Sequence, residues 1–153
     1  MFGGDGSDTF AYSALTDIVA GERLDGGAGF DLVTFYYLGY LTSPIDATRL
    51  SFTSIEGIQS NSYVPTILTG AQLSHFEWIS GVVQVSAGGL VSFSGTVETG
   101  SIRLSDAATV FDGSASTGDM RVEGGSAADT ITGGAGNDEF WGWAGNDVIH
   151  GGA

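Results

Sequence analysis

Large apolar residues recur every nine positions near the carboxyl end of the chain, at Val122, Ile131, Phe140 and Ile149. Glycine and polar residues fill most of the intervals between them. In a β-strand, one side chain points inward and its two neighbours point outward. The spacing therefore predicts a short strand around each apolar residue, with a turn between one strand and the next.

The middle of the chain continues this alternation less regularly. Its apolar clusters are separated by Ser, Thr, Gly and Asn, at intervals of about nine to twelve residues, which is typical of short strands joined by turns. The clusters are Ile55–Ile58, Ile67–Leu68, Phe76–Ile79, Val82–Val85, Val91–Phe93, Ile102–Leu104 and Val110–Phe111. Only the segment from Gly70 to Ile79 is compatible with one or two helical turns, and Gly81 would end it.

Two architectures are open for this middle part. We favour a parallel β-helix that continues the strands of both ends, because each rung would bury an apolar layer on the next. The alternative is a compact β-sandwich inserted between two short solenoids.

A repeated turn sequence connects the strands near both ends. The pattern G-G-x-G-x-D-x-U-x, in which U is a large apolar residue, fits Gly3–Ala11, Gly26–Thr34 and Gly133–Trp141 fully. Gly142–His150 departs from it only at Trp143, and Gly124–Thr132 departs only at Ala127. Five such copies exceed what a glycine-rich composition produces by chance.

The turn half of this pattern has the chemistry of a calcium site. Glycine adopts positive φ without steric cost, so a tight turn can direct several carbonyl oxygens at one point, and the aspartate adds a charged oxygen. Calcium takes six to eight such oxygen ligands. Ala115–Glu123 resembles a decayed copy in which Met120 stands at the aspartate position, which argues against a calcium ligand there.

In a solenoid with two repeats per coil, turns on the same side lie two repeats apart. We therefore expect Asp129 beside Asp147 with an ion between their turns, and Asp138 beside the turn that begins at Gly151. Asp8 and Asp31 are 23 residues apart rather than 18, so we expect Tyr12–Asp25 to form a half-coil with a five-residue insertion. On that basis they would also share an ion.

The charge distribution agrees with this interpretation. The chain has 18 acidic and 4 basic residues, and six of the acidic residues lie in 1–34 and six in 119–153. Aspartates packed this closely repel one another unless a cation lies between them. Four basic residues also argue against binding to nucleic acid, whose phosphates need positive partners.

The length of 153 residues suggests a single domain, which we divide into repeats at 1–34, a divergent β-helix segment at 35–114 and repeats at 115–153. The chain has no cysteine, so calcium would replace disulfides as the stabilising cross-link. No segment is apolar and long enough to cross a membrane. We expect the chain to be part of a longer protein.

The nonapeptides resemble the repeats-in-toxin (RTX) family, also called hemolysin-type calcium-binding repeats. The resemblance covers about 45 of the 153 residues, and weaker likenesses to long bacterial RTX proteins lie at Phe52–Ile58 and Leu68–Leu73. It implies an all-β fold, a right-handed parallel β-roll or β-helix solenoid with calcium-binding turns at both ends. It also implies calcium-dependent folding and a secreted or cell-surface bacterial protein that uses type I secretion.

The expected calcium ligands are the motif aspartates and the backbone carbonyls of the turns. They are Gly3, Asp5, Asp8, Gly27, Gly29, Asp31, Gly124, Ser126, Asp129, Gly133, Ala135, Asp138, Trp143, Gly145 and Asp147.

We expect no catalytic site. The two histidines, His75 and His150, lack a serine in a nucleophile-elbow sequence, and we place His75 at the edge of the core and His150 on the surface. Two alternative functions stay open. One is a glycan-binding or polysaccharide-modifying β-helix, with the aromatic cluster of Phe35, Tyr36, Tyr37 and Tyr40 as its groove. The other is a self-associating structural module of an adhesin or surface layer.

Overall fold

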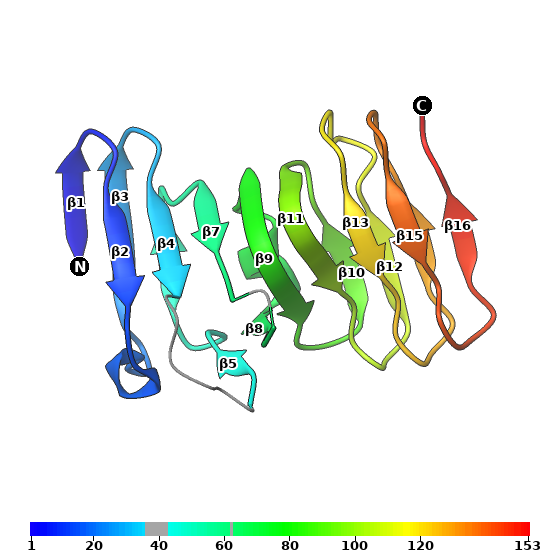
Figure 1. Ribbon diagram of the computed structural model, residues 1–153, viewed down its shortest axis with the longest axis horizontal. Helices are drawn as coiled ribbons and strands as arrows, with labels where there is room; N and C mark the ends of the chain where they lie inside the picture. The colour runs from blue at the N-terminus through cyan, green and yellow to red at the C-terminus, as the bar shows by residue number, and fades with distance from the viewer. Residues whose placement is uncertain (36–42, 62) are drawn as a thin grey trace.

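The computed structural model describes residues 1–35, 43–61 and 63–153. Within these residues every strand pairing is parallel, and the strands stack into a solenoid with its two termini at opposite ends (Figure 1). The expected all-β parallel solenoid is confirmed.

Two faces of the solenoid carry most of the strands. One face is a continuous sheet of β2 (Thr9–Tyr12), β4 (Leu32–Phe35), β7 (Gly57–Gln59), β9 (Trp78–Val85), β11 (Thr96–Arg103), β13 (Arg121–Glu123) and β15 (Glu139–Trp141). The other face consists of β1 (Phe2–Asp5), β3 (Arg23–Ala28) and β6 (Ser51–Thr53), and then of β10 (Gly89–Ser92), β12 (Thr109–Asp112), β14 (Thr130–Thr132) and β16 (Val148–His150). The short strand β5 (Ile45–Asp46) pairs with β8 (Thr66–Leu68), which also pairs with β9.

The strand register confirms two nonapeptides per coil at the carboxyl end. Arg121 lies opposite Glu139, and Thr130 lies opposite Val148, so each coil takes 18 residues. At the amino end Thr9 lies opposite Leu32, a coil of 23 residues. The extra residues of that coil include a short 3-10 helix, η1 (Leu15–Asp17).

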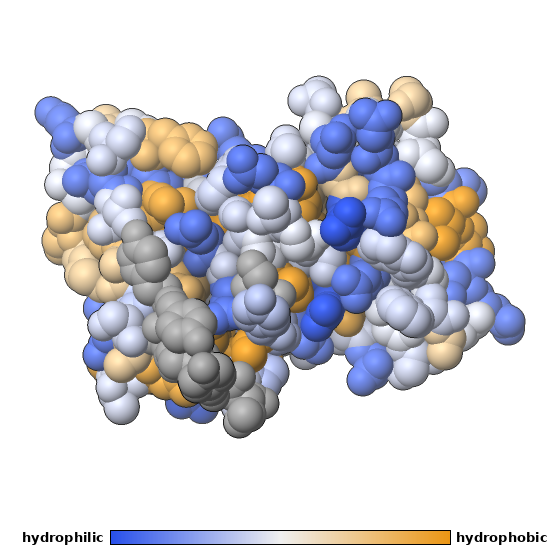
Figure 2. Space-filling view, viewed as in Figure 1, coloured by the Kyte–Doolittle hydropathy of each residue, from blue (hydrophilic) through white to orange (hydrophobic). Residues whose placement is uncertain are grey.

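The core is a column of apolar side chains between the two faces. Val122 and Ile131 are fully buried, as their position in the nonapeptide predicts. Phe140 is only partly buried and Ile149 is 43% exposed, because both lie in the last coil and have a neighbouring coil on one side only. Figure 2 shows hydrophobic surface at this end of the solenoid, where β16 lies.

The middle of the chain is part of the solenoid. Parallel pairing links β7, β9, β11 and β13 in sequence order, as in a continuous solenoid and unlike a β-sandwich inserted between two solenoids. The clusters Phe76–Ile79 and Val82–Val85 were predicted as separate strands, but the single strand β9 runs from Trp78 within the first cluster to the end of the second. Gly81 makes this possible, because its φ of +93° bends the strand without breaking it.

The one α-helix in the described part of the chain is α1 (Gly70–Leu73), which lies where the sequence allowed a helix. Its start is fixed by a capping box: the Thr69 hydroxyl accepts from the Gln72 N–H, and the Gln72 side chain accepts from the Thr69 N–H. The helix ends at Leu73, well before Gly81. No helix in the described residues has the length and apolar character needed to cross a membrane.

Shortening an inward side chain should destabilise the whole stack. Ile102 is fully buried in β11, and we expect Ile102→Ala to lower the free energy of unfolding by about 2–5 kcal/mol, because it leaves a cavity between coils. Val110 of β12 is 48% exposed, and Val110→Ala should change stability by less than about 1 kcal/mol. Urea denaturation of both variants with calcium present measures the difference, and equal effects would contradict the inward assignment of Ile102.

Candidate metal centre

The turn aspartates form ladders that cross from one coil to the next. Asp31 Oδ1 accepts a hydrogen bond from the Asp8 N–H at 2.7 Å. At the other end of the solenoid, Asp147 Oδ1 accepts from the Asp129 N–H at 2.9 Å. Each carboxylate is thus held by the backbone of the preceding coil, which positions it between two stacked turns.

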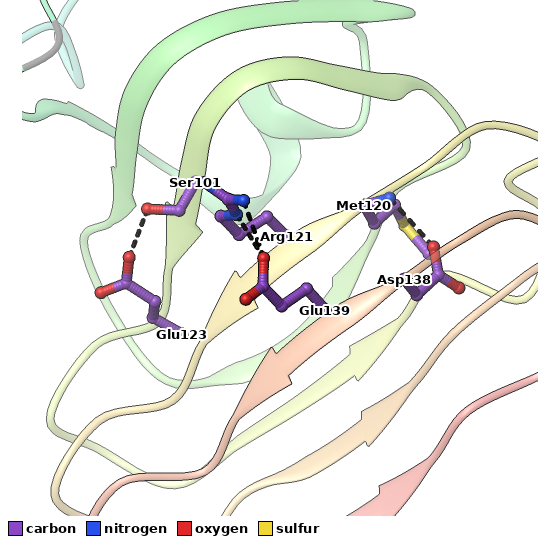
Figure 3. A network of polar contacts seen from close by, with 6 residues as sticks. All are labelled: Ser101, Met120, Arg121, Glu123, Asp138 and Glu139. Atoms are coloured by element: carbon purple, nitrogen blue, oxygen red, sulfur yellow. Dashed lines mark hydrogen bonds and ion pairs between the residues drawn. The ribbon is translucent and has the colours of Figure 1, made fainter.

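The two aspartate pairs predicted from the spacing therefore lie in adjacent turns. The turn of Asp138 also packs against the residues that follow β16, since the Ala153 N–H donates to the Gly134 carbonyl at 2.9 Å. On its other side, Asp138 Oδ1 accepts from the Met120 N–H at 2.9 Å (Figure 3). Met120 thus keeps the backbone part of the ladder while lacking the carboxylate.

The glycines of the turns allow this close stacking. A side chain at Gly3 would begin 2.5 Å from both Asp8 Oδ2 and the Gly26 carbonyl oxygen. In the same way, Gly29 faces the carbonyl oxygen of Gly6, and Gly145 faces the carbonyl oxygen of Ala127, each in the preceding coil. Glycine is required because backbone oxygens occupy the space that a side chain would fill.

Trp143 occupies a motif position that is otherwise glycine. Its φ is +62°, a left-handed conformation that is uncommon for a bulky residue. Its ring is 70% exposed, so the side chain points out of the stack and leaves the turn intact. Its backbone carbonyl is therefore kept in the turn, as the sequence suggested.

The remaining predicted ligands lie in the same turns. Gly27 stacks on the Gly4 carbonyl, and Gly124 and Gly133 each lie between their own turn aspartate and a carbonyl of the next coil. Asp5 ends β1, while Ser126 and Ala135 are exposed in their turns.

Two carboxylate oxygens at the amino end are buried without a hydrogen-bond partner. They are Asp8 Oδ2 and Asp31 Oδ2, and Asp31 as a whole is fully buried. At the carboxyl end the corresponding oxygens of Asp129 and Asp138 accept from the N–H groups of Gly125 and Gly134 at 3.0 and 3.2 Å. A buried, unpaired carboxylate oxygen is costly, so a cation fits best in the amino-terminal stack.

Backbone oxygens would have to supply most of a metal shell here. In residues 1–35, 43–61 and 63–153, no three Asp, Glu, His or Cys side chains gather closely enough to hold an ion by themselves. Carboxylates from stacked turns, together with the carbonyls that face the turn glycines, form an all-oxygen donor set. This set suits calcium rather than zinc, which prefers nitrogen and sulfur.

Two ion pairs join coils on the outer face of the sheet. Arg121 contacts Glu139 at 2.7 Å, and Arg103 contacts Glu123 at 3.2 Å; Figure 3 shows the first pair, with Ser101 donating to Glu123. The sequence interpretation missed both pairs. Arg121 and Glu139 have the same spacing as Asp129 and Asp147, so the coil length used for the aspartates could have revealed this pair. Arg103 and Glu123 are separated by a slightly longer coil, which the repeats do not specify.

Other predicted features lie away from the turns. Phe35 is buried and stacks on Tyr12 with ring centroids 5.4 Å apart, so it offers no groove surface. Tyr36, Tyr37 and Tyr40 lie outside the described residues. His150 is exposed as expected, and His75 is exposed rather than at the core edge because it follows α1 on the outside of the coil.

Comparison with known proteins identifies the turns. The family described as RTX calcium-binding nonapeptide repeat (4 copies) matches residues 123–153. Residues 123–153 are therefore RTX-type calcium-binding repeats. No curated protein and no solved structure matched the chain. The match lies at the carboxyl end, whereas the two unpartnered carboxylate oxygens lie in the amino-terminal repeats.

A single methyl group should test how tightly the turns stack. We expect Gly26→Ala to lower the melting temperature by several degrees, because its Cβ would collide with the Ser54 carbonyl and Asp31 Oδ2. Gly151 occupies the same motif position and has open space around it, so Gly151→Ala should melt like the unchanged protein. Differential scanning calorimetry measures both, and a normal melting temperature for Gly26→Ala would contradict the close approach.

Proposed function

We propose that this chain is a calcium-binding β-roll module of a secreted or cell-surface bacterial protein, and that calcium outside the cell completes its folding. Its work is structural, and no residue is assigned a catalytic role. The single observation that carries the proposal is the pair of buried, unpartnered oxygens of Asp8 and Asp31, which lie in stacked turns.

The ligands we assign are the motif aspartates and the carbonyl groups of the turns. Asp8 and Asp31 would hold calcium in the amino-terminal stack, and Asp129, Asp138 and Asp147 would hold it in the carboxyl-terminal stack. A bound calcium ion supplies two positive charges between carboxylates that otherwise repel. The turns then keep these carboxylates in place through the cross-coil N–H bonds.

The net charge of −14 gives the dependence on calcium its physical basis. Without cations, self-repulsion favours expanded states of the acidic ends. An ion that binds only the folded state stabilises it by about 2.7 kcal/mol when its concentration is a hundred times Kd. Several sites acting together would couple folding to arrival in a calcium-rich compartment.

Circular dichroism with calcium and then with chelator tests the proposal. We expect calcium to increase the β-sheet signal and to raise the melting temperature, because the ions bind only the stacked turns. Lowering the pH should reduce the gain, since protonated carboxylates are poor ligands. Identical melting curves with calcium and with chelator would refute calcium-dependent folding.

The carboxyl-terminal stack can be tested at its last coil. Asp147→Asn should bind one calcium ion fewer, because the amide oxygen can still accept from the Asp129 N–H while the negative charge is lost. Glu98 is exposed in β11, away from the turns, so Glu98→Gln is the control and should bind the full number. Native mass spectrometry counts the ions, and an unchanged count in Asp147→Asn would exclude Asp147 as a ligand.

A further inference from the structure

One arrangement of oxygens recurs wherever intact turns stack. A Cβ atom added to Gly3 would lie 2.5 Å from both Asp8 Oδ2 and the carbonyl oxygen of Gly26 in the following coil. These two oxygens therefore converge beside Gly3. Next to Gly133, the Asp138 carboxylate and the Gly151 carbonyl do the same. The arrangement therefore combines a carboxylate from one turn with a carbonyl from the next.

The same arrangement is present next to Gly26, although the nonapeptide pattern is absent from the coil that follows. Here Asp31 Oδ2 and the Ser54 carbonyl oxygen converge. The register of β3 and β6 explains this, because Asp25 lies opposite Thr53 and the next residues, Gly26 and Ser54, are then adjacent. Ser54 has a φ of +48°, a left-handed conformation that is uncommon for a residue other than glycine.

Glu56 takes the place of the missing aspartate. Its Oε2 accepts a hydrogen bond from the Asp31 N–H at 2.9 Å, as Asp31 Oδ1 accepts from the Asp8 N–H at 2.7 Å. The ladder thus runs from Asp8 through Asp31 to Glu56. Glu56 itself donates its N–H to the Asp31 carbonyl, so the ladder ends there.

Asp31 has an oxygen free for a ligand on this side. Its side chain is fully buried, and the Oδ2 atom that meets Ser54 has no hydrogen-bond donor. The two ion pairs in the described part of the chain, Arg103 with Glu123 and Arg121 with Glu139, lie in other coils. A buried carboxylate oxygen with a carbonyl beside it and a second carboxylate nearby is the donor chemistry of a divalent cation.

We propose that a further calcium site lies between the turn Gly26–Asp31 and the segment Ser54–Glu56, outside the nonapeptide repeats. Asp31 Oδ2, the Ser54 carbonyl and the Glu56 carboxylate are its ligands from this chain. The site rests on the proposed calcium binding of the repeats, which it extends by one coil toward the middle of the solenoid. Asp31 then serves two ions, one shared with Asp8 and one shared with Glu56.

Counting calcium ions by native mass spectrometry tests the site. Glu56→Gln should bind one ion fewer than the unchanged chain, because the amide keeps an oxygen for the Asp31 N–H but loses the charge. Glu77 is the counterpart of Glu56 in the next coil, because Glu56 precedes Gly57, Glu77 precedes Trp78, and Gly57 pairs with Trp78. The Glu77 side chain is exposed. Glu77→Gln is therefore the matched control and should keep the full count.

A second comparison does not depend on Glu56. Asp31→Asn should lose two ions and Asp8→Asn only one, since Asp8 belongs to a single site. Loss of one ion in both variants, or a full count in Glu56→Gln, would overturn this site while leaving calcium binding by the repeats intact. An unchanged chain that binds no calcium would overturn the proposed function as well.

Melting in chelator separates a ligand from a structural side chain. Glu56→Gln and Glu77→Gln should melt alike without calcium, and Glu56→Gln should melt lower only when calcium is present. If the melting temperature of Glu56→Gln is lowered equally with calcium and with chelator, Glu56 acts only through its hydrogen bond to Asp31. That result would overturn the site.

Discussion

The stacking of turns around buried carboxylates is the constraint on which the rest of this structure depends. Successive coils approach so closely that carbonyl oxygens of one turn occupy the side-chain space of glycines in the next. This contact brings aspartates of the same sign together in a chain of net charge −14. Hydrogen bonds and cations are the two means by which a protein offsets such repulsion.

The coils solve this problem in different ways along the chain. In the carboxyl-terminal repeats, the N–H groups of Gly125 and Gly134 satisfy the second oxygens of Asp129 and Asp138. On the outer face, arginines of one coil pair with glutamates of the next. Among the described residues, the second carboxylate oxygens of Asp8 and Asp31 have no hydrogen-bond donor and no arginine partner. The two buried oxygens without a partner therefore lie in repeats that the family comparison does not match.

The ends and the middle of the chain differed in how far they could be predicted. The inward positions Val122 and Ile131 follow from a period that is local and regular. In the middle the period varies, so the apolar pattern predicts two strands, at Phe76–Ile79 and Val82–Val85, where Gly81 allows one. The contact of Ser54 with Gly26 and the ion pair of Arg103 with Glu123 were not predicted, because each joins residues one coil apart where the coil length was unknown.

The sequence alone determined the parallel β-solenoid of the repeats, the two repeats per coil at the carboxyl end and the identity of the turn aspartates, while it left two architectures open for the middle. These properties depend on local rules: glycine where backbone must approach backbone, and one apolar residue per short strand. Only the tertiary structure decided which carboxylate oxygens are buried and unpartnered, and that Glu56 continues the ladder of Asp8 and Asp31. Those contacts depend on how insertions of different length are accommodated between coils, and no local pattern specifies that register.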